Sequence, residues 1–213
     1  MTTDTLQLIG LFTAKKIADL SRSNNSAQRA ILANLRRGIG RVPGDLPQLW
    51  NIIWADMPEE LQGSGDTPSR AEWAIYTALT LYALHQQGRD PQRESMNQSA
   101  ADKAESCYHN SLGRSVAKLV HGAEDQKRIL RRFNVAATSA SMKELATHLR
   151  SLIQLLKADG IPLNYPQLAK DLYLYQFPEG AAKVRMRWGQ DFYRRVNSDH
   201  NNSKLQDQMK EDL

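Results

Sequence analysis

The chain has 213 residues, of which 41% are hydrophobic and 24% are charged, and its formal net charge is +5. This length suits one sizeable domain or two small ones, and the apolar fraction is sufficient for a core. A single cysteine excludes an intramolecular disulfide framework, and the first ten residues carry neither a basic segment nor a long apolar run, so we expect a cytoplasmic protein with no signal peptide and no membrane partner.

The N-terminal part of the chain is predicted to be helical. Apolar residues recur at helical spacing over residues 4–20 and 70–87. A further helix between them is expected to start at Ser26, a good N-cap residue, and to end at a glycine. Trp50 and Trp54 follow in a proline-punctuated stretch, four residues apart. They share one side of a short helix, and we interpret them as core residues.

Residues 91–110 are polar and show no clean period, which predicts a linker or flexible loop. This stretch divides the chain into an N-terminal helical bundle, residues 1–90, and a C-terminal helical bundle, residues 111–196. The polar residues 197–213 are predicted to form a disordered tail. Alternation of period two is almost absent from the chain. The predicted fold class is therefore all-α, with two small helical bundles joined by a polar linker.

The clearest helix begins at the sequence Ser-Met-Lys-Glu, residues 141–144, which is typical of a capping box. Leucines follow at alternating spacings of four and three: Leu145, Leu149, Leu152 and Leu156. They predict one apolar stripe that faces a core. Lysine or arginine recurs every seven residues on the same helix: Lys143, Arg150 and Lys157. The segment before it repeats the arrangement, with Ile129 and Phe133 on an apolar face beside a basic edge.

The basic residues are unevenly distributed. Residues 15–41 hold seven Lys or Arg against one acid, residues 42–113 hold four against ten, and residues 114–195 hold fifteen against seven. Two basic regions separated by an acidic one indicate a directed electrostatic surface that can attract a polyanion. The alternative is that many of these cations lie on ordinary solvated helix faces. In the last helix, Asp191 is expected to pair with Arg187 and Arg195, each four residues away.

The sequence offers no set of residues that converges on a catalytic or metal site. The five histidines are scattered without metal-ligand spacing, and the glycines at 63–67 lack the lysine of a phosphate-binding loop. Cys107 and His109 are close in sequence, but the polar linker contains nothing to orient them. We therefore expect no enzymatic activity, no metal, no cofactor and no small-molecule substrate.

Several stretches resemble the CasB family, the small subunit of the type I-E CRISPR surveillance complex Cascade. They cover most of the C-terminal half: SLGRSVAKLV at 111–120, RRFN at 131–134, ELATHLRSLIQLLKADGIPLNYPQLAKDLY at 144–173 and RWGQDFYRR at 187–195. In the N-terminal half, LRRGIG at 35–40 is similar to the family's basic motif. The stretch 88–110 departs from the family, which usually has a shorter approach to the SLG motif.

The resemblance implies a non-catalytic, all-helical subunit that pairs with a second copy of itself. It implies other Cascade subunits, the guide crRNA and the target and displaced DNA strands as partners. The implied role is to stabilise the guide RNA–target DNA duplex and the displaced strand, together called the R-loop. The family motifs carry over these candidate nucleic-acid-binding residues: Arg36, Arg37, Arg114, Lys118, Arg131, Arg132 and Arg150. Helical spacing alone adds three more: Arg29, Arg128 and Lys157.

Two other functions are compatible with the same basic faces. The chain could be a helical scaffold subunit that docks on acidic protein partners, or a stand-alone RNA-binding protein. Affinity for nucleic acid that falls steeply with salt would favour the nucleic-acid functions over the scaffold. Copurification with guide RNA and the other Cascade subunits would distinguish the CRISPR function from the stand-alone one.

Overall fold

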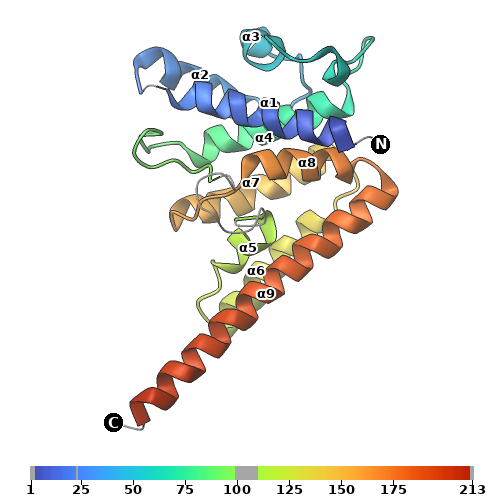
Figure 1. The fold of residues 1–213 in the computed structure, drawn as a ribbon. Coiled ribbons are helices and arrows are strands. Elements are labelled where there is room, and N and C mark those ends of the chain that lie inside the picture. Colours follow the sequence, from blue (N-terminus) through green and yellow to red (C-terminus); the bar gives the residue numbers. More distant parts are fainter. Residues whose placement is uncertain (1–2, 23, 99–109, 212–213) are drawn as a thin grey trace.

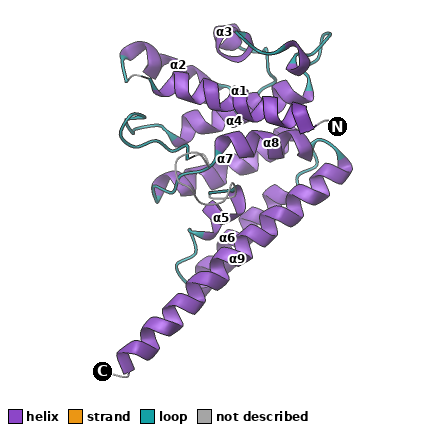
Figure 2. Ribbon diagram, viewed as in Figure 1, coloured by secondary structure: helices purple, strands orange, loops and turns teal. Residues whose placement is uncertain are grey.

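The computed structural model describes residues 3–22, 24–98 and 110–211, with only the backbone described from residue 199 onward. Within these ranges the chain is helical and contains no β-strand (Figure 2). An isolated bridge joins Asn97 to Leu163. The predicted all-α class is confirmed. None of the described helices is both long enough and apolar enough to cross a membrane.

The elements follow one another in this order: α1 (Thr3–Ser21), α2 (Ser26–Arg37), η1 (Pro47–Leu49), α3 (Trp50–Trp54), η2 (Glu59–Leu61), α4 (Arg70–His85), α5 (Leu112–Ala117), α6 (Ala123–Ala137), α7 (Met142–Ala158), α8 (Tyr165–Tyr175) and α9 (Pro178–Glu211). Figure 1 shows α4 between α1 and α2 on one side and α7 and α8 on the other. It packs against all four of these helices and is buried along almost its whole length. The short α5 packs against α9, and α6 packs against α7.

Side-chain caps determine where several helices begin. Ser141 accepts a hydrogen bond from the Glu144 N–H at 3.2 Å, as the capping box predicts, and Glu144 reaches back to the Ala140 N–H at 2.8 Å, one residue before the predicted partner. For α2 the N-cap is Asn25 and not Ser26, because the Asn25 Oδ1 accepts from Gln28 N at 2.9 Å. Asparagine and serine are similarly good N-cap residues, so the sequence alone could not tell which of these two adjacent residues caps the helix.

The leucine stripe of α7 is buried as predicted. All four of its leucines have no exposed surface, and they join a hydrophobic cluster that includes residues of α1, α2, α4, α8 and α9. The side chain of Tyr165 at the start of α8 is also fully buried, and its hydroxyl hydrogen-bonds to His85 at 3.0 Å. α8 thus packs on α1 and α4, which come from the N-terminal part of the chain. The division of the chain at residues 91–110 stays a prediction.

The first part of the predicted linker, residues 91–98, hydrogen-bonds to residues before it and after it in the chain. The Met96 N–H donates to the Gln86 side chain at 2.9 Å, and the Gln98 N–H donates to the Leu163 carbonyl at 3.1 Å. Met96 itself is buried. Residues 99–109 of the predicted linker, with Cys107 and His109, lie outside the described residues.

The structure differs from the prediction at the C-terminus. The backbone of α9 remains helical to Glu211, whereas the sequence predicts a disordered tail from residue 197. No proline or glycine follows Gly189, so nothing in the sequence forces this helix to end. Polar composition indicates poor core-forming ability, but it does not by itself break a helix that tertiary packing has already started.

Candidate nucleic-acid interface

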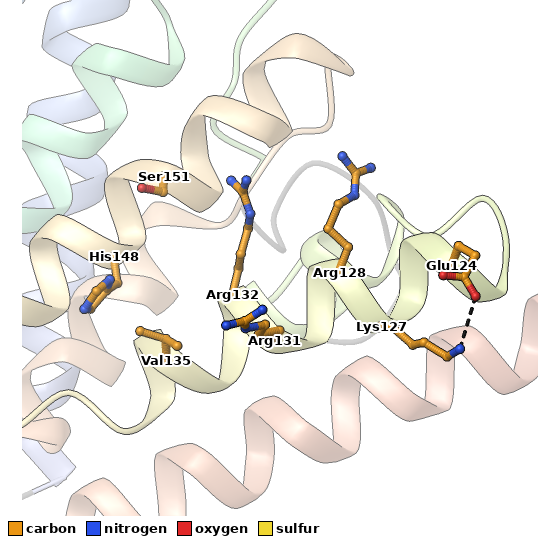
Figure 3. Close-up of a pocket in the computed structure, with 8 residues that line it drawn as sticks. All are labelled: Glu124, Lys127, Arg128, Arg131, Arg132, Val135, His148 and Ser151. Carbon is orange, nitrogen blue, oxygen red and sulfur yellow. Dashed lines mark hydrogen bonds and ion pairs between the residues drawn. The ribbon is translucent and has the colours of Figure 1, made fainter.

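A basic groove of about 620 Å³ lies between α6 and α7 (Figure 3). We call it the α6–α7 groove, and eight residues line it: Glu124, Lys127, Arg128, Arg131, Arg132, Val135, His148 and Ser151. Six of these come from α6 and two from α7. Three of the ten sequence-predicted residues therefore meet here, namely Arg128, Arg131 and Arg132.

The amphipathic pattern of α6 directs its cations into the groove. Ile129, Phe133 and Ala136 are buried, so the residues between them must point outward. The Phe133 ring contacts two aromatic rings of α9, with centroid distances of 6.1 Å to Trp188 and 5.8 Å to Phe192. These contacts fix the rotation of α6 about its own axis. The packing of one face thereby holds the basic face in place.

The four groove cations differ in how they are paired. Lys127 and Arg128 each form an ion pair with an acid of the first turn, at 3.1 Å to Glu124 and 2.7 Å to Asp125. Pairs of this kind between exposed residues three apart contribute only about 0.3–0.5 kcal/mol, so a phosphate can replace the acid. Arg131 and Arg132, in contrast, make no ion pair or hydrogen bond with any residue that the structure describes.

The wall formed by α7 contributes two polar residues that the sequence did not suggest as site residues. His148 lies 3.7 Å from the Glu144 carboxylate, measured from Nε2 to Oε1, and is half-buried, whereas Ser151 is exposed. Both lie on the side of α7 that faces α6. Helical spacing alone places both residues beside the buried stripe that contains Leu149 and Leu152. Only the packing of α6 shows which side of that stripe borders a groove.

Arg36 and Lys157 lie instead where the C-terminal ends of helices meet. The Arg36 Nη1 donates to the Ala83 carbonyl of α4 at 3.5 Å, and the Lys157 Nζ donates to the Gln87 side chain at 3.1 Å. Nearby, the Arg89 Nη2 donates to the Lys157 carbonyl at 3.3 Å. Burial lowers the pKa of Lys157, and the charges of Arg36 and Arg89 lower it further. Cations at helix C-termini complement unpaired carbonyls and the helix dipole, so this cluster has a structural use of its own.

Arg114 lies on α5 and Lys118 is the C-cap residue of this helix, and neither lines the α6–α7 groove. Arg114 is half-buried, and the Lys118 Nζ donates to the Asn110 Oδ1 at 2.6 Å. Asn110 has a φ of 58°, in the left-handed region, and its carbonyl accepts from Asn164 N at 2.9 Å. Lys118 therefore helps to hold the turn that leads into α5.

The remaining three predicted residues are exposed but do not line the groove. Arg29 and Arg37 lie on α2. Arg150 lies on α7. The structure thus separates the ten predicted cations into the groove set, a helix-end cluster, a pair on α5 and its C-cap, and isolated surface residues.

The predicted pairing of Asp191 with Arg187 is wrong. Arg187 pairs with Asp171 of α8, and the Trp188 indole donates to the same carboxylate at 2.7 Å. Asp191 is buried and accepts from the Ser111 hydroxyl at 2.7 Å, while Arg194 approaches it at 3.6 Å. The spacing of four residues could not reveal acceptors on other helices.

Comparison with known proteins identifies the family. A family model described as CRISPR-associated protein Cse2 matches residues 31–193, from α2 to α9, and so includes the whole groove. The chain belongs to the Cse2 family. The resemblance to CasB in the sequence is therefore confirmed.

Solved structures of Cse2-family proteins have the same fold. CasB from Thermobifida fusca is 30% identical, with a TM-score of 0.69 over 87% of this chain and 97% of that one. CasB from M. ruber is 20% identical, with a TM-score of 0.65 over 90% and 98%. A chain of a CRISPR RNA-guided surveillance complex is also 20% identical, with a TM-score of 0.63 over 93% and 99%. A search of curated proteins finds no match.

Proposed function

We propose that this Cse2-family protein is a non-catalytic subunit of a CRISPR RNA-guided surveillance complex and binds nucleic-acid backbone in the α6–α7 groove. The observation that carries the proposal is the pair Arg131 and Arg132. Both are exposed in a groove lined by four cations, and neither has an ion-pair or hydrogen-bond partner among the described residues. Membership of the complex is supported by the Cse2 family and by the similar fold of a chain from such a complex.

Within that complex the groove would stabilise the R-loop, through the guide RNA–target DNA duplex and the displaced DNA strand. Exchange of a DNA duplex for an RNA–DNA duplex is nearly balanced in free energy, so a few added phosphate contacts can shift it. Arginine suits this task because its planar fork can bind two phosphate oxygens at once. Such contacts read no bases, so the guide would supply all sequence specificity. A second copy of the chain is a further proposed partner.

Salt dependence of binding tests the groove directly. For the isolated chain on single-stranded DNA, log K should fall linearly with log salt concentration, with a slope of about −0.7 for each phosphate neutralised. Replacing either Arg131 or Arg132 with alanine should flatten this slope by about 0.7. Arg93→Ala is the matched control, because Arg93 is an exposed arginine outside the groove. A slope near zero for the wild type would favour the scaffold function instead.

R-loop formation by the reconstituted complex tests the role. The Arg131→Ala/Arg132→Ala variant should form R-loops poorly on an intact duplex target and nearly normally on a target with a pre-opened bubble, where strand separation has already taken place. The two arginines would then act on opening. An equal defect on both targets, or none on either, would mean that they serve a protein interface instead.

A further inference from the structure

The loop between α2 and α3, together with the first residue of α3, presents an apolar patch that the proposed function leaves unexplained; we call this region the α2–α3 loop. Trp50 is 53% exposed and Val42 is 41% exposed, although both are large hydrophobic residues. The sequence predicted that Trp50 and Trp54 would both be core residues. Only Trp54 is half-buried, and its indole N–H donates to the Glu72 carboxylate at 2.6 Å. α3 has only five residues, which leaves Trp50 at its first position and pointing away from the core.

The loop holds the exposed indole in a fixed position. The Trp50 Nε1 donates to the Gly44 carbonyl at 3.0 Å, and Gly44 has a φ of 104°, which favours glycine. The Asp45 carboxylate accepts from the Val42 N–H at 3.2 Å and closes the same turn. The polar atom of the indole is therefore already satisfied within the chain. What remains exposed is an ordered apolar surface, which loses little conformational entropy when a partner covers it.

The charges around this loop decide what kind of partner fits. Residues 41–69 carry five carboxylates and a single arginine, Arg41, next to Val42. One of the carboxylates, Asp56, pairs with Lys15 at 3.2 Å. Proteins that stack nucleobases on aromatic rings combine those rings with a cationic path for the backbone, which this segment lacks. Anchors of protein–protein interfaces, in contrast, are enriched in tryptophan, and charge complementarity then selects a partner surface with cations.

We propose that Trp50 and Val42 form a docking surface for a protein partner that has an apolar pocket edged by lysine or arginine side chains. The chain would then bind nucleic acid on the α6–α7 groove and protein at the α2–α3 loop. The chemistry of the patch carries this proposal. Only the choice of binding probe rests on the proposed membership of a surveillance complex.

The probe is a guide-loaded complex reconstituted from the other subunits of the same source, without this chain. Fluorescently labelled full-length protein is titrated with it, and the dissociation constant is measured. Trp50→Ala should weaken docking by about tenfold or more, as for an anchor residue, and Val42→Ser by a smaller factor. Leu11→Ala is the matched control, since Leu11 is 61% exposed on α1 and should be silent. Melting temperatures of all variants show that they are folded, and Val42→Ser serves as the second variant if Trp50→Ala is unstable.

Each result is decisive. Weaker docking of Trp50→Ala with unchanged affinity for single-stranded DNA supports the proposal. Equal docking of Trp50→Ala and the wild type overturns it, and so does a loss of DNA affinity, which would mean base stacking. If light scattering shows a wild-type dimer that Trp50→Ala abolishes while docking persists, the patch is a self-interface and the proposal is likewise overturned. Failure of the wild type itself to dock would refute the membership of the complex, which is a separate outcome.

Discussion

Gly113 allows α5 to lie close against α9, and we predict that it tolerates no side chain. It lies in the SLG stretch at the start of α5, against the backbone of α9. A Cβ at this position would overlap with the Trp188 carbonyl oxygen and would lie only 3.0 Å from both Asp191 Cβ and Phe192 N. Two of these three atoms belong to the backbone of a long helix, so they cannot rotate away. Gly113→Ala must therefore move α5 as a unit.

The expected cost follows from this geometry. Overpacking of a well-packed interior costs about 1–3 kcal/mol, and a clash with backbone belongs at the upper end, about 3 kcal/mol. For a chain of this size that corresponds to a fall in melting temperature of about 6–12 °C. Gly189 on α9 is the matched control, because a Cβ there would meet no atom within 4 Å. Gly189→Ala removes the flexibility of a glycine within a helix and should stabilise by about 0.5–1 kcal/mol.

The assay is urea unfolding followed by circular dichroism, which gives the free energy of unfolding and its dependence on urea concentration. The two alanine variants should shift the midpoint in opposite directions with an unchanged slope. A Gly113→Ala variant as stable as the wild type, or two variants that both lose stability equally, would show that α5 does not lie against α9 as described.

Leu149→Ala should lower the free energy of unfolding by about 2–5 kcal/mol, because the leucine is fully buried. Arg150→Ala should lower it by well under 1 kcal/mol, since surface substitutions cost roughly half that or less. Equal losses in melting temperature would contradict the predicted orientation of α7, with Leu149 inward and Arg150 outward. Burial lowers the pKa of His85 from 6.5 to about 4, so the unfolded chain takes up a proton first as the pH falls. Stability should therefore be lost between about pH 6.5 and pH 4, by about 3 kcal/mol in total, and unfolding of His85→Gln across this range should lack that component; identical pH profiles for the two proteins would count against a buried neutral imidazole. Asp171→Ala should destabilise the protein by about 3–5 kcal/mol, because it leaves the Arg187 guanidinium and the buried Trp188 indole without their shared acceptor. A melting temperature within about 2–4 °C of the wild type, which is about 1 kcal/mol for a chain of this size, would refute the importance of this contact.

Local pattern was sufficient for the parts of the fold that depend on one helix at a time. The leucine stripe of α7 and the apolar face of α6 follow from a period of 3.6 residues, which is a property of the backbone and needs no knowledge of the neighbours. The same holds for the all-α class, since alternation of period two is almost absent. The motifs around residues 111–120 and 144–173 were enough to identify the family. These predictions are confirmed.

The partners of charged side chains could not be predicted in this way. Arg187 finds its acceptor on α8, 16 residues away, and Arg36 finds a carbonyl of α4, 47 residues away. Whether a cation is available to a ligand depends on such distant groups, which helical spacing does not report. Sequence therefore placed Arg36 and Arg131 in one class of site residue, and the fold separated them.

What the sequence by itself determined is which face of each helix is apolar and which is basic, because that follows from the order of the side chains. Only the tertiary structure decided which basic faces meet across a groove and which cap the ends of other helices. It also decided that Trp50 lies exposed while Trp54 is half-buried, although the two share one spacing pattern. The physical reason is that burial and pairing are set by the neighbours that the fold supplies, and those neighbours come from distant parts of the chain.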